Sequence, residues 1–146
     1  MRIVVDKAPF DLGTEATTFA GGVQDAGAIV TFTGVVRDVD GGLAAMEIEH
    51  YPGMTQSAIT KIAQEALTRW SLADVLVIHR FGRLEPGAPI MMVATASRHR
   101  KDAFEAAEYL MDYLKSRAPF WKKEITRDGS DWVAARDEDE DALNRW

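Results

Sequence analysis

The spacing of apolar residues in this sequence changes several times between a strand period and a helix period, and this pattern constrains the fold more than any other feature. Short stretches rich in β-branched residues predict strands, whereas residues 54–70 repeat apolar side chains on one face of a helix. We expect strands at 2–6, 27–37, 43–51, 73–81 and 89–97, helices at 54–70 and 101–116, and a weakly helical stretch at 14–20. Strands mixed with packed helices predict an α+β fold.

Residues 27–97 give three specific expectations. Residues 27–37 are apolar on both faces, which is typical of a buried central strand. The turn-forming residues 38–42 (DVDGG) then predict a hairpin between this strand and residues 43–51. Residues 82–88 (GRLEPGA) predict a turn between the two following strands.

The second half predicts a helix, a hairpin and a short end helix. The helix at 101–116 ends before Pro119, which cannot continue it. Its side chains expected to face the core are Ala103, Phe104, Ala107, Leu110, Met111 and Leu114. Residues 121–135 predict a hairpin that turns at Asp128–Gly129, ahead of an acidic last helical turn. Because no repeat or linker divides the chain, we expect residues 1–146 to form a single domain.

Composition excludes several classes of protein. The chain has no cysteine, which rules out disulfides, thiolate metal sites, iron–sulfur clusters and a cysteine nucleophile. No apolar stretch approaches the ~20 residues that span a bilayer, and the N-terminus is not a signal peptide, so we expect a cytoplasmic protein without membrane contact. The net charge of −6 argues against nucleic acid as a partner.

The charges are unevenly distributed along the chain. Residues 98–127 hold eight of the 17 basic residues, and residues 128–141 are strongly acidic. A basic segment within an acidic protein favours a small anionic ligand over a polyanion. The alternative is a solvated charged face with no ligand.

Common catalytic and metal-binding motifs are missing. The histidines His50, His79 and His99 have no zinc-like spacing, so we expect no metal site. The sequence also lacks a P-loop, a dinucleotide-binding glycine motif and a nucleophile elbow. Nucleotide-binding and serine-hydrolase interpretations therefore have no support.

Cations at the ends of predicted elements are the remaining candidates. Arg37 closes the strand at 27–36, and His99 with Arg100 precedes a helix, where free backbone N–H groups attract anions. Phosphate binding uses several such donors from different directions. Lys115, next to the core residue Leu114, is expected to be partly shielded among other cations, which would lower its pKa and free it as a nucleophile or base. Each cation alone also fits a surface or capping role.

Five ordered blocks of sequence resemble the MoaE family, the large catalytic subunits of molybdopterin synthase. These blocks are GAIVTFTGVVRD (27–38), EIEHYPGM (47–54), VIHRFGRLEPG (77–87), ASRHRKDAFEA (96–106) and DYLKSRAPFWKKE (112–124), with the later DGSDW (128–132). The similarity runs through residues 2–146. The lysines that flank the Pro-aromatic-Trp turn are its most specific element.

The resemblance implies a sulfurtransferase of molybdenum cofactor biosynthesis. Such enzymes convert cyclic pyranopterin monophosphate (precursor Z) into molybdopterin by installing two sulfurs as a dithiolene. The resemblance also implies a small ubiquitin-like partner with a C-terminal Gly-Gly thiocarboxylate, and a central homodimer of large subunits within a heterotetramer. The implied fold is an α/β hammerhead with an antiparallel sheet, two main helices and an added β subdomain. We expect no metal or resident cofactor.

Carried over residue by residue, the resemblance assigns the candidate site. Lys115 and Lys122 are the catalytic residues. The residues expected to bind substrate are Val35, Val36, Arg37, His99, Arg100, Lys115, Lys122, Lys123, Glu124 and Arg136, and those expected to line the pocket are Phe32 and Met111. His99 and Arg100 are expected to reach a neighbouring active site across the dimer interface, and Arg136 is expected to come from the other subunit.

These assignments lead to a mechanistic hypothesis and two alternatives. We expect Lys115 to engage the carbonyl of the partner's tail and the pterin, and Lys122 to stabilise the phosphate as its cyclic ester opens. One alternative is a non-enzymatic adaptor for a ubiquitin-like tail. The other is a phosphoester-processing enzyme in which His99 serves as the general base.

Overall fold

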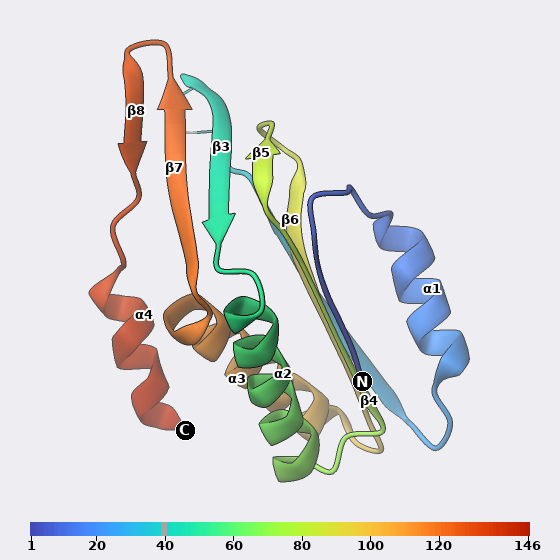
Figure 1. Ribbon diagram of the computed structural model, residues 1–146. Helices are drawn as coiled ribbons and strands as arrows, with labels where there is room; N and C mark the ends of the chain where they lie inside the picture. Colours follow the sequence, from blue (N-terminus) through green and yellow to red (C-terminus); the bar gives the residue numbers. More distant parts are fainter. Residues whose placement is uncertain (39–40) are drawn as a thin grey trace.

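The computed structural model describes residues 1–38 and 41–146, and it contains two β-sheets and four α-helices (Figure 1). The strands are β1 (Arg2–Asp6), β2 (Ala28–Val35), β3 (Leu43–His50), β4 (Asp74–Arg80), β5 (Gly82–Leu84), β6 (Pro89–Ser97), β7 (Phe120–Thr126) and β8 (Gly129–Trp132). The helices are α1 (Leu12–Gly22), α2 (Met54–Arg69), α3 (Arg100–Arg117) and α4 (Asp137–Ala142), with a 3₁₀ turn at Leu143–Arg145. The first sheet has the strand order β1-β4-β6-β2, and the second has the order β5-β3-β7-β8.

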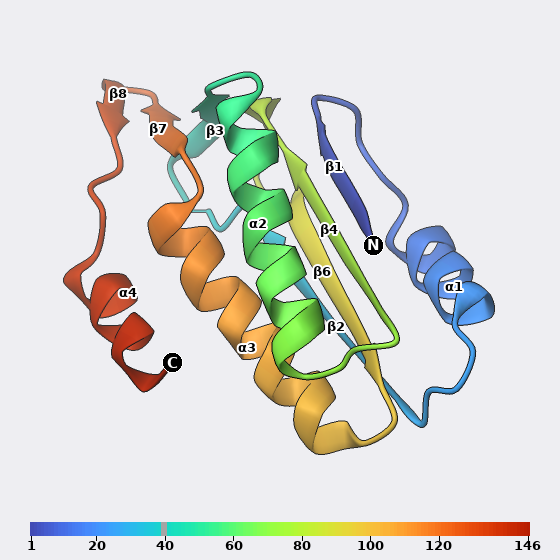
Figure 2. The ribbon, with the colours of Figure 1, turned by 60° about the horizontal axis from the view of Figure 1, so that its bottom comes forward.

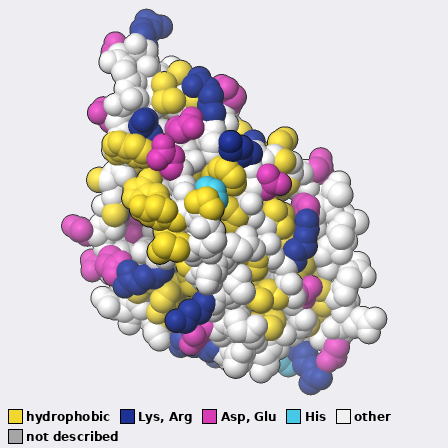
Figure 3. Space-filling model, in the orientation of Figure 1, with side chains coloured by type: hydrophobic (Ala, Val, Ile, Leu, Met, Phe, Trp, Pro, Cys, Tyr) yellow, Lys and Arg dark blue, Asp and Glu magenta, His cyan; other side chains and the backbone are white. Residues whose placement is uncertain are grey.

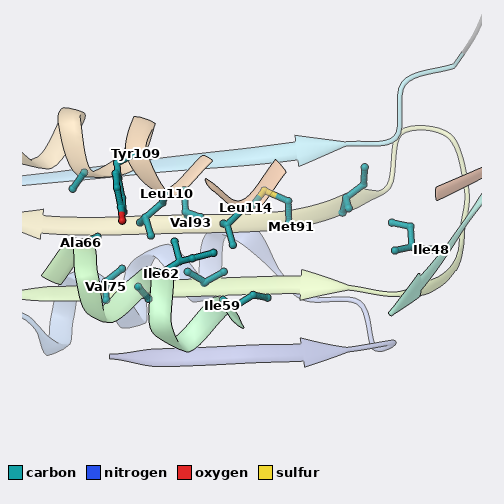
Figure 4. Packing of buried hydrophobic residues seen from close by; sticks show 14 of the residues in the cluster. Ile48, Ile59, Ile62, Ala66, Val75, Met91, Val93, Tyr109, Leu110 and Leu114 are labelled. Atoms are coloured by element: carbon teal, nitrogen blue, oxygen red, sulfur yellow. The ribbon is translucent and has the colours of Figure 1, made fainter. Parts of the chain in front are cut away.

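The two long helices α2 and α3 pack side by side against one face of the first sheet, and α1 packs against the opposite face (Figure 2). The main core lies between the two long helices and this sheet, where Ile59 of α2 and Leu110 of α3 meet Val75 and Val93 of the sheet (Figure 4). Ile48 of the second sheet belongs to the same core. One apolar cluster therefore joins both sheets and fixes their junction.

The expected α+β class is confirmed, with two main helices and the second sheet as the added β subdomain. One pair of strands departs from the expected antiparallel arrangement. Strand β1 pairs with β4 in parallel, while the other strand pairs of both sheets are antiparallel. The first sheet is therefore mixed.

The prediction that residues 27–37 form a buried central strand is wrong. Strand β2 is an edge strand of the first sheet, and it pairs with β6 alone. Its side chains Ile29, Phe32 and Val35 are exposed. The central strands instead are β4 and β6, which carry the long buried runs. An apolar pattern shows that both faces of a strand carry apolar side chains. It does not show whether other parts of the same chain pack against those side chains.

The expected hairpin between residues 27–37 and 43–51 does not form, because β2 and β3 lie in different sheets. Residues 39 and 40 of the expected turn lie outside the described residues. Strand β3 pairs instead with β7 and with β5, a short strand inside the stretch expected to be only a turn. Gly82 has a φ of +88°, a conformation that suits glycine, and this lets the chain pass from β4 into the second sheet.

The predicted helices are confirmed, but in α3 one side chain differs from the expectation. Helix α3 buries Ala103, Ala107, Leu110 and Leu114 as expected, but Phe104 is 59% exposed. The helix turns Phe104 outward because the core face is taken by residues at 103, 106, 107 and 110. Within the part of the chain that the structure describes, no helix is long and apolar enough to cross a membrane.

Candidate active site

Two lysines come together where α3 leads into β7. Lys115 lies in the last turn of α3, and Lys122 lies near the beginning of β7. Pro119 ends the helix and directs the chain into the strand, so the two side chains reach the same region from different elements. Burial is the largest cause that lowers the pKa of Lys122, and the charge of Lys115 lowers this pKa further. Asp139 of α4 acts in the opposite direction.

The shielded lysine is Lys122, which corrects the expectation for Lys115. Lys115 is exposed, because the core stripe of α3 passes through Leu114 and leaves the next position at the surface. Lys122 is less exposed, because it lies on β7, an inner strand of the second sheet. It lies opposite Ile48 of β3, and its carbonyl accepts a hydrogen bond of 2.7 Å from the Val133 N–H. The pair thus combines one exposed cation with one cation that is partly desolvated by burial.

Alternation along β7 separates the expected substrate-binding residues of this strand. Glu124 lies on the same face of β7 as Lys122, whereas Lys123 lies on the opposite face. The Lys123 Nζ lies 4.6 Å from the centre of the Trp132 ring, a cation–π contact on the outer surface of the second sheet. Figure 3 shows apolar and charged side chains close together on this surface. The structure therefore does not bring Lys123 to the lysine pair.

Arg37 lies at the same end of the first sheet as the lysine pair. Strand β2 ends opposite the beginning of β6, and α3 runs back along this sheet, so the ends of β2 and α3 lie close together. Met91, which pairs with Gly34 of β2, lies near Leu114 of α3 (Figure 4). Two backbone hydrogen bonds hold Val36, the residue before Arg37, in place. The Val36 N–H donates to the Ala88 carbonyl (2.9 Å), and the Val36 carbonyl accepts from the Gly87 N–H (2.7 Å).

The other residues expected at this end differ in exposure. Val36 is buried, while Val35 and Phe32 are exposed on β2. Met111 of α3 is half-buried and packs against the main core. Phe32 and Val35 are therefore available at the surface, and Val36 serves mainly to anchor the loop that carries Arg37.

His99 and Arg100 lie at the opposite end of α3 from Lys115. His99 is the N-cap residue, and Arg100 begins the helix. Lys115 follows fifteen residues later, and a rise of about 1.5 Å per residue separates the two ends by about 22 Å. Both residues are exposed. One copy of the chain does not bring these cations to the lysine pair.

Arg136 lies at the beginning of α4 and pairs with a carboxylate of the same helix. It is the N-cap residue of α4, and its guanidinium forms an exposed ion pair with Glu138 at 3.2 Å. Helix α4 is fastened to the end of α3, where the Ser116 hydroxyl donates to the Asp139 carbonyl (2.9 Å) and Arg117 pairs with Glu140 (2.6 Å). This attachment explains why Asp139 influences Lys122.

Comparison with known proteins decides the family. The MoaE protein family model matches residues 5–117. A molybdopterin synthase catalytic subunit of Cereibacter sphaeroides is 68% identical over 146 residues and covers 100% of both chains. A catalytic subunit of Salmonella typhimurium is 50% identical, covering 99% of this chain and 97% of that protein. The chain belongs to the MoaE family.

Solved structures of MoaE proteins have the same fold. The molybdopterin biosynthesis MoaE protein from Burkholderia ambifaria aligns with a TM-score of 0.85 and 51% identity, covering 99% of this chain and 97% of that chain. A molybdopterin synthase from Staphylococcus aureus aligns with a TM-score of 0.78 and 32% identity, covering 90% and 95%.

Membership of the MoaE family makes this chain an enzyme, a transferase of molybdenum cofactor biosynthesis. The matching MoaE relatives are named as catalytic subunits, so neither the adaptor nor an unrelated phosphoester-processing enzyme is supported. Among the described residues, no group of three or more His, Asp or Glu side chains is arranged to hold a metal ion.

A group of stacked rings near Lys122 in this MoaE protein is not predicted by the sequence patterns. His79 of β4 is buried, and its ring stacks on Phe120 with the ring centres 3.7 Å apart. His50 of β3 packs on Phe81 with the ring centres 4.0 Å apart. A signal was present, because alternation along β4 places His79 on the same face as Val75 and Val77, which belong to the main core.

Proposed function

We propose that this chain converts precursor Z into molybdopterin in the cytoplasm, taking two sulfurs from the C-terminal thiocarboxylate of a small ubiquitin-like subunit. The observation that carries the proposal is the pair formed by Lys115 and Lys122. Two cations close together repel each other, and an anion bound between them relieves this repulsion. The cyclic phosphate of the pterin and the thiocarboxylate are both anions. This site is therefore suited to bring them together.

The two lysines take different roles in the proposed reaction. The sulfur of the first thiocarboxylate attacks a side-chain carbon of the pterin and displaces the phosphate oxygen from it, which opens the cyclic ester. The second sulfur replaces the oxygen of the neighbouring carbon, which leaves as water. In both steps water then cleaves the acyl–sulfur bond, which leaves the sulfur on the pterin and a carboxylate on the carrier. Lys115 is exposed at the end of α3, where it is free to engage the carbonyl of the tail. The backbone of Lys122 is held in β7 and its side chain is partly desolvated, and a partly desolvated charge is suited to stabilise the phosphate as the cyclic ester opens. Arg37, at the same end of the sheet, would orient the phosphate.

The proposed assembly contains a second copy of the chain and a small subunit. A small-subunit partner is supported by the solved complex of subunits 1 and 2 of the molybdopterin-converting factor from Helicobacter pylori. A second copy is supported by the separation of about 22 Å along α3, because His99 and Arg100 can serve a lysine pair only if that pair lies in another chain. Phe104, one helical turn after Arg100, is exposed and adds an apolar contact to such an interface. Arg136 is proposed to reach the site from the second copy as well.

Reconstitution tests the proposed function. The purified chain is mixed with precursor Z and a thiocarboxylated small subunit, and molybdopterin is measured as its fluorescent oxidation product. We expect product that depends on all three components. A complex that forms with the small subunit but makes no product would overturn the proposal.

Complementation between two inactive variants tests the shared site. We expect a His99→Ala/Arg100→Ala chain and a Lys115→Ala chain each to be inactive alone. When the two are co-expressed with different tags, random pairing restores about a quarter of the active sites, since only mixed dimers contain an intact site. Purifying the mixed dimers through both tags should raise this fraction to about half. Mixed dimers as inactive as the single variants would show that the sites are not shared.

We also propose that the reaction needs no metal or cofactor bound to this chain. A thiocarboxylate is anionic and nucleophilic at neutral pH, so a cationic site can attract it and direct its attack. We expect exhaustive treatment with a chelator, followed by its removal, to change the rate of product formation by less than about twofold. A large loss that is recovered by adding back one metal ion would contradict this part of the proposal.

A further inference from the structure

His79 lies buried at the junction of the two sheets. It is in β4, on the face that contacts the main core, and only 6% of the residue is exposed. Its ring is nearly parallel to that of Phe120, with an angle of 15° between the planes and 3.7 Å between the centres. Phe120 is the first residue of β7, so this stack joins the first sheet to the strand that carries Lys122.

The His79 ring is neutral at physiological pH. Burial is the largest cause that lowers its pKa, to about 3, and the nearby charge of Lys122 contributes in the same direction. The Nδ1 atom lies 2.7 Å from the Arg80 carbonyl oxygen. Because a carbonyl oxygen only accepts hydrogen bonds, the Nδ1 atom carries the proton of the neutral ring.

Phe120 connects this ring to the lysine. Phe120 and Lys122 lie two residues apart and therefore on the same face of β7. The beginning of β7 is also tied to α2, because the buried Thr55 hydroxyl donates to the Pro119 carbonyl at 3.1 Å. The ring of His79 is thus the surface on which the first residue of β7 stacks, two residues before Lys122.

We propose that His79 is a positioning residue that acts on Lys122 through Phe120: its neutral ring fixes the beginning of β7 and keeps the lysine partly desolvated without adding a positive charge. The inference rests on the proposed role of Lys122 and extends it to a residue outside the candidate site. It assigns the function to the volume, stacking and neutrality of the ring and not to a proton transfer by His79.

Several charged or titratable groups lie near Lys122, and two of them act on its pKa besides burial. Lys115 of α3 and Asp139 of α4 contribute with opposite signs, and His79 of β4 lies close enough for Lys122 to lower its pKa. On the same face of the second sheet, His50 lies opposite Phe120, and Glu124 follows Lys122. Of these groups, His79 alone combines near-complete burial with a stacking contact to β7.

Two substitutions separate the ring from its nitrogen atoms. His79→Phe keeps a neutral ring that stacks on Phe120, whereas His79→Ala removes the ring and lets water approach Lys122. The pH dependence of Lys122 acylation by an amine-reactive reagent is measured by mass spectrometry, with the exposed Lys61 of the same chain as an internal reference. We expect His79→Ala to raise the midpoint for Lys122 by about one pH unit, and His79→Phe to leave it within about 0.3 units.

Turnover with the small subunit and precursor Z supplies the second readout. We expect His79→Ala to lower kcat about tenfold. We also expect it to shift to higher pH the limb of the pH–rate profile that reports the titration of Lys122. In His79→Phe, both kcat and this limb should be close to those of the unsubstituted chain. An unchanged Lys122 midpoint in His79→Ala would overturn the inference. So would a His79→Phe chain that behaves like His79→Ala, because the nitrogen atoms and not the ring would then be required.

The acylation measurement does not depend on turnover, so it separates this inference from the proposed function. A reconstituted enzyme without product would overturn the proposed function, whereas the Lys122 midpoint would still test the support by His79. If His79→Ala does not fold, Phe120→Leu takes its place, since it keeps an apolar side chain and removes the stacked ring. The same upward shift is expected from Phe120→Leu, and its absence would overturn the inference.

Discussion

Replacing Lys115 by alanine is expected to abolish molybdopterin formation, with a loss of at least about 100-fold in product formed per active site. The reason is the position of this lysine at the end of α3, near the partly desolvated charge of Lys122. Removing the Lys115 amine takes away the exposed member of the pair, and with it the group proposed to engage the tail carbonyl. The measurement is reconstituted turnover, with the oxidised pterin detected by fluorescence.

Two further variants make this result specific. Lys115→Arg keeps the positive charge but does not act as a nucleophile or base at neutral pH, so partial activity would assign an electrostatic role to Lys115. Lys61→Ala removes an exposed lysine from the surface of α2 and should keep full activity. Binding of the small subunit, measured by size-exclusion chromatography, should be unchanged in all three variants. Near-normal turnover of Lys115→Ala would show that the catalytic assignment is wrong.

Local patterns were sufficient to predict the elements of the fold but not the way the strands are shared between sheets. The helical period over residues 54–70 corresponds closely to α2, and α3 ends two residues before Pro119, as the helix-ending effect of proline predicts. The sequence predicts a central position for β2 because its exposed apolar residues resemble those of a central strand. Strand β3 was paired wrongly because its partner β7 lies about 75 residues later, and no local pattern encodes a contact over that distance.

The candidate site was likewise predictable in its residue types but not in its burial. The resemblance to MoaE proteins pointed to Lys115 and Lys122, and the structure brings these two together. Which lysine loses contact with water depends on how β7 enters the second sheet, so the sequence favoured Lys115 where the structure shields Lys122. The contribution of His79 needed the packing of two sheets, since its stacking partner Phe120 lies 41 residues further along the chain.

The buried imidazole of His79 is also expected to make the folded protein sensitive to mild acid. The pKa of His79 is about 3 in the folded chain against an ordinary value of 6.5. Below pH 6.5 the unfolded chain therefore takes up a proton that the folded chain does not, and the free energy of unfolding decreases as the pH falls. The loss continues down to about pH 3 and amounts to about 2 kcal/mol between pH 6.5 and pH 5.

His79→Phe should remove this acid dependence. Urea unfolding at pH 7.5, 6 and 5 gives the free energy of unfolding at each pH, and the slope of this free energy against pH is compared between the two chains. The cost of about 1 kcal/mol that is expected when the Arg80 carbonyl loses its donor is the same at each pH, so it does not affect this slope. The carboxyl groups of Asp11 and Glu140 also have lowered pKa values, but their ordinary values are 3.8 and 4.5, so their contribution is lost at lower pH. His99→Gln is the matched control, because that ring is exposed in the fold. If His79→Phe kept the full acid dependence while His99→Gln lost it, His79 would not be the buried neutral group that the stack on Phe120 requires.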